Sequence, residues 1–238
     1  MVVPIKILLQ SALDLLYPPH CESCQKPGRL LCRNCVRQLR RIRSPYCQVC
    51  SLPVSGRSSQ KLICADCRLR NFHFQFAICG YEANDVMRRL IHRFKYHGIS
   101  RLELLLSQLI FHAWRDRRAT LQPPEILVPV PLHSRRERER GFNQSARLAK
   151  ALSRRTGIPY GTLLKKSVFT ESQTLLNRRQ RRQNLRGAFT LRQNSLLTGL
   201  SVMLVDDVLT TGSTLEECSK TLLAGGARAV SAITLARA

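Results

Sequence analysis

The chain has 238 residues, of which 44% are hydrophobic, and this is enough for one medium-sized α/β domain and a small additional module. Its 39 Lys and Arg against 15 Asp and Glu give a formal net charge of +24. A balance this basic predicts a polyanionic ligand, for which nucleic acid, phosphorylated metabolites and anionic lipid all qualify. Residues 135–192 hold 16 Lys and Arg against 3 acidic residues, so we expect an anion to face this region.

The first 20 residues are partly apolar but fit neither an export signal nor a membrane span. Asp14 interrupts the apolar stretch, no basic segment precedes it, and no small-residue cleavage site follows it. The stretch is also far shorter than the roughly 20 apolar residues that a membrane-spanning helix needs. We therefore expect residues 5–16 to form an amphipathic helix packed on the protein, and we expect a cytoplasmic protein without a membrane span.

Eight of the ten cysteines form four C-x-x-C pairs within the first 67 residues. Two cysteines with this spacing on a tight turn can direct both sulfurs to one ion, and two such pairs complete a tetrahedral Zn²⁺ site. Pairing by proximity predicts two sites, and a crossed pairing is the alternative. The ligands are Cys21, Cys24, Cys32 and Cys35 for the first site, and Cys47, Cys50, Cys64 and Cys67 for the second.

Zinc is a better explanation of these pairs than disulfides, because a cytoplasmic chain keeps its thiols reduced. Four thiolates leave no open coordination position, so both sites are expected to be structural. The two remaining cysteines, Cys79 and Cys218, are expected to be buried packing residues. We expect residues 1–72 to form a cysteine-rich zinc domain, and residues 73–238 to form a second domain.

Beyond the cysteines, apolar runs alternate with amphipathic segments. This alternation predicts an α/β fold with a mainly parallel sheet flanked by helices, whose ligands bind at the carboxyl ends of the strands. The expected strands are residues 76–81, 126–130, 189–191, 201–205 and 230–235, and the expected helices are residues 85–96, 102–118, 144–156, 173–185 and 213–224.

The most informative segment is SVMLVDDVLTTGSTLEEC, residues 201–218. An apolar run ends in two acids, a loop of Thr and Gly follows, and Ser213 or Thr214 can cap the next helix. Backbone N–H groups of residues 210–214, together with the positive end of that helix, would bind a phosphate. A Walker phosphate-binding loop is excluded, because no G-x-x-x-x-G-K-[ST] occurs.

The two acids in this segment, Asp206 and Asp207, have a use beside a bound phosphate. They can accept hydrogen bonds from the 2'- and 3'-hydroxyls of a ribose whose 5'-phosphate lies in the loop, and they can lie near a Mg²⁺ ion. Taken alone, the acid pair could simply close a strand. The acids and the phosphate loop together favour a site for a phosphorylated ribose.

The segment VMLVDDVLTTGST resembles the motif with which type I phosphoribosyltransferases bind phosphoribosyl diphosphate (PRPP). The chain as a whole resembles the ComF family, which includes the competence proteins ComF and ComFC and the protein called GntX. The resemblance implies a type I phosphoribosyltransferase fold behind an N-terminal double zinc ribbon. It is carried by LLYPPHCESC, CRNCVRQL, CQVC, LIHRFKYHG and VPVPLHSRRERERGFNQSARLAKAL, and then by Gln173, Leu176, Arg181 and Asn184 ahead of GAF.

The resemblance also implies roles for individual residues. It implies that Asp206 and Asp207 bind the ribose hydroxyls and that the loop after them holds the 5'-phosphate through Thr210, Thr211, Gly212, Ser213 and Thr214. It implies that residues 131–140 form a loop that binds pyrophosphate, with Arg135, Arg136 and Arg140 as contacts. Residues 170–187 would form a mobile loop that closes over PRPP, with Gln173, Arg181 and Asn184 near the pyrophosphate or the acceptor.

The function that the resemblance implies is transfer of a phosphoribosyl group from PRPP, with Mg²⁺, to an acceptor that the sequence does not identify. Asp206, Asp207 and Arg181 would take part in catalysis. The family is associated with natural transformation, so single-stranded DNA and proteins of DNA uptake are candidate partners. The alternative is a non-catalytic accessory protein of competence that binds single-stranded DNA and uses PRPP as a ligand or regulator. For Lys95, in RFKYHG, the sequence leaves open a role in the site or a place on the surface.

Overall fold

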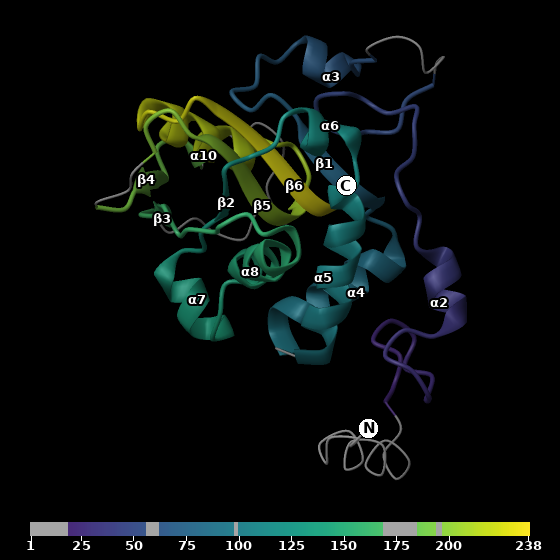
Figure 1. Ribbon diagram of the computed structural model, residues 1–238. Coiled ribbons are helices and arrows are strands. Elements are labelled where there is room, and N and C mark those ends of the chain that lie inside the picture. Colours follow the sequence, from purple (N-terminus) through teal and green to yellow (C-terminus); the bar gives the residue numbers. More distant parts are fainter. Residues whose placement is uncertain (1–18, 56–61, 98–99, 169–184, 194–196) are drawn as a thin grey trace, which may run out of the picture.

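A parallel sheet of four strands forms the centre of the fold. The computed structural model describes residues 19–55, 62–97, 100–168, 185–193 and 197–238 (Figure 1). The strands are β1 (Ala77–Glu82), β2 (Ile126–Pro129), β5 (Ser201–Leu209) and β6 (Ala229–Arg237), in the order β1-β6-β5-β2. Each neighbouring pair is parallel, as the sequence pattern predicted.

Helices cover both faces of this sheet, which is why its strands are almost continuously buried. α4 (Asp85–His97), α5 (Ser100–Trp114) and α8 (Gln144–Thr156) pack with Met203 and Val205 on one face. α10 (Ser213–Ala224) packs with Val202 and Leu204 on the other (Figure 1). Because successive side chains of a strand point to opposite faces, Asp206 and Asp207 begin on different sides of the sheet.

A second, small sheet lies beside α10. It pairs β3 (Leu164–Lys166) with β4 (Phe189–Leu191) in antiparallel fashion. The β4 strand was predicted, whereas β3 was not, because three residues of which two are lysines carry no alternation that a strand pattern could use.

The expected helix over residues 102–118 is wrong in its extent, since it consists of two helices. α5 ends at Trp114 and α6 (Arg117–Leu121) begins anew, because the Asp116 side chain accepts a hydrogen bond from the backbone N–H of Arg118 and caps it. The expected loop over residues 131–140 is also corrected, because residues 134–140 form helix α7 (Ser134–Arg140). The expected helix over residues 5–16 lies outside the described residues, as does all but the last residue of the one over 173–185.

Both cysteine-rich segments pack directly on the sheet and its helices. The first segment contains α2 (Arg33–Gln38) and lies on α4, where Arg89 donates to the Ser23 carbonyl at 3.1 Å and Arg93 pairs with Glu22 at 2.6 Å. The second contains α3 (Ala65–Arg68) and lies over the face that α10 covers. The two segments therefore belong to the hydrophobic core on opposite faces of the same sheet.

Both edges of the sheet are covered by additional backbone. Beside β1, the Ile42 N–H donates to the Gly80 carbonyl and the Glu82 N–H donates to the Arg40 carbonyl. Beside β2, Leu127 exchanges hydrogen bonds with residues 159–161. Within the part of the chain that the structure describes, no helix is both long enough and apolar enough to cross a membrane.

Candidate functional site

The eight paired cysteines form two separate clusters. Within each cluster the four sulfur atoms lie within 4.8 Å of one another, and the clusters are those that pairing by proximity predicted, so the crossed pairing is wrong. Four thiolates at such separations are the donor set of a structural zinc site. The first cluster is Cys21, Cys24, Cys32 and Cys35, and the second is Cys47, Cys50, Cys64 and Cys67.

Each cluster already contains donors that stabilise a thiolate. The backbone N–H of Cys32 points at the Cys21 sulfur at 3.4 Å, and that of Cys64 points at the Cys47 sulfur at 3.3 Å. The Cys50 thiol and the backbone N–H groups of Cys64, Cys50 and Val49 lower the pKa of Cys47 to about 4. The hydrogen bond with Cys47 and, after it, burial raise the pKa of Cys50 strongly. A bound Zn²⁺ would supply the positive charge that lets all four sulfurs ionise together.

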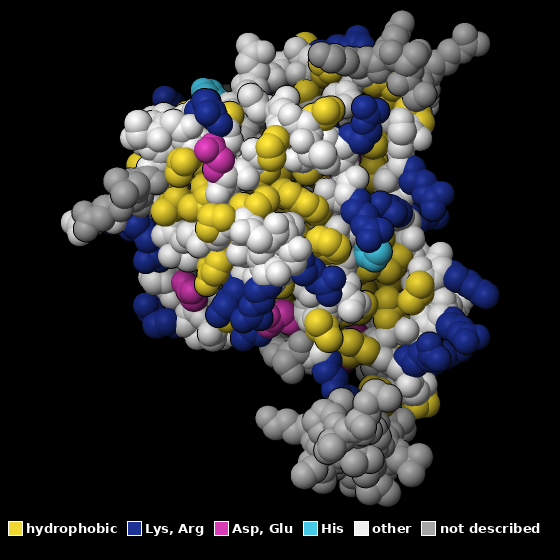
Figure 2. All heavy atoms as spheres, in the orientation of Figure 1, with side chains coloured by type: hydrophobic (Ala, Val, Ile, Leu, Met, Phe, Trp, Pro, Cys, Tyr) yellow, Lys and Arg dark blue, Asp and Glu magenta, His cyan; other side chains and the backbone are white. Residues whose placement is uncertain are grey.

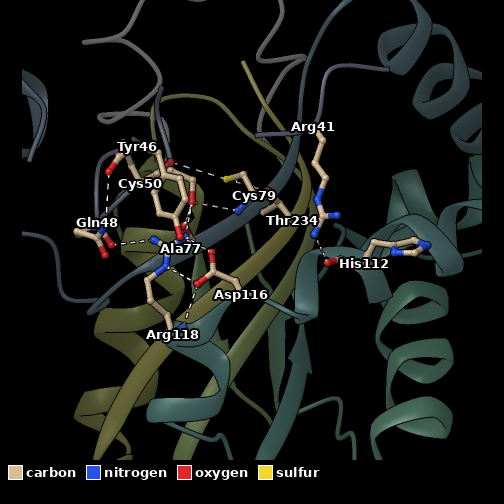
Figure 3. A network of polar contacts seen from close by, with 11 residues as sticks. Arg41, Tyr46, Gln48, Cys50, Ala77, Cys79, His112, Asp116, Arg118 and Thr234 are labelled. Carbon is tan, nitrogen blue, oxygen red and sulfur yellow. Dashed lines mark hydrogen bonds and ion pairs between the residues drawn. The ribbon is translucent and has the colours of Figure 1, made fainter. Parts of the chain in front are cut away.

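A polar network fixes the second cluster to the sheet domain (Figure 3). Arg118 donates to the Gln48 carbonyl and to the Ser51 hydroxyl, both at 2.8 Å, and Tyr46 donates to Asp116 at 2.8 Å. The Ser51 hydroxyl in turn donates to the Ala77 carbonyl on β1 at 2.7 Å. The turn at Gln48 and Ser51, within the second cysteine-rich segment, is therefore attached to the sheet by charged and neutral hydrogen bonds as well as by apolar packing.

The loop between β5 and α10 has the form that phosphate binding requires. Gly212 adopts a left-handed conformation with φ 78° at the N-terminus of α10, a conformation that glycine tolerates best. The Thr211 and Ser213 hydroxyls lie 2.9 Å apart. Among the described residues, no acceptor bonds the N–H groups of Thr211, Gly212 and Thr214. These amides and the positive end of α10 can serve an anion.

Two arginines hold the carbonyl groups of this loop. Arg237, at the end of β6, donates to the Thr210 carbonyl at 2.8 Å and to the Leu209 carbonyl at 3.2 Å. Arg70 donates to the Thr211 carbonyl at 2.6 Å. No sequence pattern connects either arginine to the loop, since Arg70 lies 141 residues from Thr211 and Arg237 belongs to a different strand.

Asp206 is half-buried at the carboxyl edge of the sheet, where the N-terminus of α8 reaches it. Ser145 donates its hydroxyl to Asp206 Oδ1 at 2.8 Å, and the backbone N–H of Asp207 donates to the same oxygen at 2.9 Å. Burial and the adjacent Asp207 carboxylate nevertheless raise the pKa of Asp206 to about 7. A hydrogen-bond donor or cation that arrives at Asp206 would therefore relieve an unfavourable charge.

Asp207 is more deeply buried, with 4% of its surface exposed, and it is already paired. The Lys95 ammonium of α4 lies 2.9 Å from Asp207 Oδ2. Phe94 next to it packs against Phe142, and Tyr96 lies under the Arg140 guanidinium at 5.1 Å from its ring centre. The end of α4 thus contacts both the acid pair and the segment that follows α7, and Lys95 lies at the candidate site.

The arginines expected at the pyrophosphate divide between two sides of α7. Arg135 is exposed and pairs with Glu139 at 3.2 Å, whereas Arg140 is half-buried and donates to the Gln144 side chain at 3.1 Å. Arg136 is half-buried as well, and burial together with this arginine lowers the pKa of Lys166 to about 8. Lys166 is a cation of this region that the sequence analysis missed. Gln173, Arg181 and Asn184 lie outside the described residues.

Comparison with known proteins identifies the family of this chain. Residues 12–68 match the double zinc ribbon domain, and residues 143–238 match the phosphoribosyl transferase domain. Competence protein F of Haemophilus influenzae is 34% identical over 212 residues, which are 87% of this chain and 90% of that protein. The chain belongs to the ComF family.

Other ComF relatives align over almost the whole chain. The DNA utilization protein YhgH of Salmonella typhimurium is 34% identical over 230 residues, 94% of this chain and 99% of that protein. Competence protein ComFC of Bacillus subtilis is 30% identical over 225 residues, 89% of this chain and 86% of that protein. The expected fold, a phosphoribosyltransferase-type parallel sheet with an N-terminal double zinc ribbon, is confirmed.

The clusters predict a zinc content of two ions per chain that falls by one when a ligand is lost. We expect Cys64→Ser to lower the measured zinc by one ion, because three thiolates and a hydroxyl bind Zn²⁺ far more weakly than four thiolates. Atomic emission measures the zinc of the purified protein. Cys218→Ser is the matched control, since Cys218 is buried away from both clusters, and it should keep both ions. Equal zinc in the two variants would contradict the assignment.

The raised pKa of Asp206 predicts a pH dependence of stability. A carboxyl whose pKa is raised in the folded state contributes stability at low pH that is lost as the pH rises through about 7. The side chain of Asp206→Asn cannot ionise. The free energy of unfolding of the wild type should therefore fall by about 1 kcal/mol relative to that of Asp206→Asn between pH 6 and pH 8.5. Urea denaturation at several pH values measures this. Asp85→Asn, at an exposed position, should show no such drift.

Proposed function

We propose that this ComF protein binds PRPP with Mg²⁺ at the carboxyl edge of its parallel sheet and transfers the phosphoribosyl group to an acceptor. One observation carries the proposal: β5 carries a carboxylate pair near its end, and the loop that follows β5 holds the N–H groups of Thr211, Gly212 and Thr214, which no acceptor among the described residues bonds. A ribose 5-phosphate offers the matching groups, hydroxyls at one end and a dianionic phosphate at the other. The match to the phosphoribosyl transferase domain covers this segment.

In this proposal each part of the site binds one part of the ligand. The 5'-phosphate accepts hydrogen bonds from the backbone N–H groups of residues 211–214 and from the Thr210, Thr211, Ser213 and Thr214 hydroxyls, while Gly212 lets the backbone approach closely. Asp206 accepts hydrogen bonds from the ribose hydroxyls. Its raised pKa favours this role, because hydroxyl donors stabilise the ionised carboxylate that burial disfavours.

Asp207 differs from Asp206, because its Oδ2 already forms an ion pair with the Lys95 ammonium. A carboxylate has about four acceptor positions, so a ribose hydroxyl can share Asp207 with the ammonium group. Lys95 also places a positive charge beside the two neighbouring carboxylates, which reduces their mutual repulsion. The ion pair therefore maintains the second hydroxyl acceptor.

The chemistry of transfer places opposite charges at two points. As pyrophosphate leaves the anomeric carbon, positive charge develops on the ribose ring, where Asp206 and Asp207 stabilise it. Negative charge develops on the pyrophosphate, for which the half-buried Arg136 and Arg140 of α7 are the candidate cations, together with Arg181, which lies outside the described residues. Mg²⁺, when bound with PRPP, would neutralise further charge on the leaving group.

The proposal predicts that Asp206→Asn weakens the binding of Mg²⁺–PRPP by about 10-fold or more, because hydrogen bonds to an ionised group are lost. Isothermal titration calorimetry measures the affinity, and a pyrophosphate-release assay with candidate acceptors measures turnover. Asp85→Asn is the control for charge alone. Because Asp206→Asn is expected to be at least as stable as the wild type, unfolding cannot explain a loss. Unchanged affinity would refute the proposed site.

A second candidate function rests on charge. The protein carries a formal net charge of +24, and Figure 2 shows Lys and Arg side chains in several separate groups with few acidic side chains between them. Relatives bear the names competence protein and DNA utilization protein. On this view the protein binds single-stranded DNA as an accessory protein of DNA uptake, and PRPP is a ligand or regulator rather than a substrate.

The two functions separate by salt dependence. The DNA-binding function predicts an affinity for an oligothymidine that falls steeply with salt, with a log–log slope that decreases by about 1 for each phosphate contact removed. Arg138→Ala with Arg154→Ala, both at exposed positions, should weaken this binding, whereas Asp206→Asn should not. Fluorescence anisotropy at several salt concentrations measures both. Oligothymidine binding that is absent or insensitive to salt would refute the second function.

A further inference from the structure

A short segment joins the second zinc cluster to the phosphate loop. We call residues 69–73 the strap. It begins two residues after the cluster ligand Cys67, and it leads into the polypeptide that enters β1. Helix α3, which precedes the strap, has only four residues, with Cys64 as its N-cap and Cys67 within it. A helix this short has no stability of its own, so the metal ligands must fix where the strap begins.

Three successive contacts attach the strap to the phosphate loop and α10. Arg70 donates to the Thr211 carbonyl at 2.6 Å and stacks on the Phe72 ring at 4.4 Å. Phe72 lies so close to Gly212 that a side chain there would meet its ring at 3.1 Å. His73 contacts Glu216, in the first turn of α10, with its backbone N–H at 2.8 Å and its ring at 2.6 Å.

The contact of Arg70 fixes the direction of an amide that the ligand needs. In a planar trans peptide the C=O of one residue and the N–H of the next point in opposite directions. Arg70 holds the Thr211 carbonyl, so the Gly212 N–H is directed to the other side of the loop. Arg237 does the same for the Thr210 carbonyl and the Thr211 N–H. Without these bonds a glycine-containing loop could rotate its peptides at little cost.

We propose that Arg70 is a positioning residue of the phosphate loop, and that the second zinc site sets the affinity for a 5'-phosphate through it. The inference rests on the proposed function for the identity of the ligand, a phosphate monoester of ribose, but not for the coupling between metal and loop. Zinc at Cys47, Cys50, Cys64 and Cys67 orders α3, α3 places the strap, and Arg70 orients the amides of the loop.

The test compares Arg70→Ala with Arg68→Ala in the full-length zinc-loaded protein. Arg68 lies two residues away, is exposed and, among the described residues, donates to the Ile63 carbonyl of the same cysteine-rich segment, so its replacement controls for charge. Ribose 5-phosphate is the probe, titrated by calorimetry. We expect Arg70→Ala to lower its affinity about 10-fold with both zinc ions retained, and Arg68→Ala to change it less than about 2-fold. Arg70→Lys should recover part of the loss.

Hydrogen exchange of residues 210–214 without any ligand provides a readout that does not depend on the proposed function. Exchange should accelerate in Arg70→Ala and in Cys64→Ser, but not in Arg68→Ala or in Cys21→Ser at the first cluster. In the double variant of Arg70 and Cys64, the two effects should not add, because they act through one contact.

The outcomes separate the two proposals. If exchange responds as expected but ribose 5-phosphate does not bind the wild type, the coupling stands and the proposed function fails. If ribose 5-phosphate binds but neither its affinity nor the exchange responds to Arg70→Ala, the coupling is overturned and the proposed function stands. Additive effects in the double variant would also overturn the coupling.

Discussion

Two adjacent carboxylates near the end of one strand impose the main electrostatic constraint on this fold. Asp206 is half-buried and Asp207 is buried, so each needs a hydrogen-bond donor or a cation close to it. The N-terminus of α8 supplies Ser145 to the first, and the end of α4 supplies Lys95 to the second. The arrangement of these helices at the carboxyl edge is therefore tied to the same acids that the ligand would use.

The zinc ribbons are integrated into this arrangement rather than appended to it. The first ribbon lies on α4, the helix that carries Lys95 near its end, and the second reaches the phosphate loop through the strap. Each metal cluster is thus connected by a short chain of contacts to one half of the candidate site. A structural metal in such a position would influence ligand binding without touching the ligand.

The features that sequence reasoning predicted correctly are those that have local signals. Apolar runs located the four strands of the parallel sheet, and the C-x-x-C spacing located both clusters. The turn after β5 was predicted from its contiguous Thr, Gly and Ser residues, but the expected N-cap at Ser213 or Thr214 is wrong, because α10 begins at Ser213 with Gly212 as its N-cap. The error at residues 131–140 also concerns local signals. A helix begins after the N-cap His133 and ends before Gly141, which adopts a left-handed conformation, and these two signals were not used when a loop was expected.

The residues that sequence reasoning missed act over long separations. Arg70 and Arg237 support the phosphate loop from other elements, and Lys166 comes from a strand too short to show a pattern. Lys95 was noticed only as an open alternative, because a lysine near the end of an amphipathic helix is usually a surface residue. Such contacts depend on the order of strands in the sheet, which no local pattern contains.

The backbone that covers the edge strand β1 also affects how readily the incompletely folded protein aggregates. Residues 40–42, which connect the two ribbons, pair with the outer side of β1 and satisfy its hydrogen-bonding groups. An open strand border recruits strands from other molecules and so starts aggregation. Loss of zinc would free this connecting segment at both of its ends, so metal supply would govern solubility during synthesis as well as ligand binding afterwards.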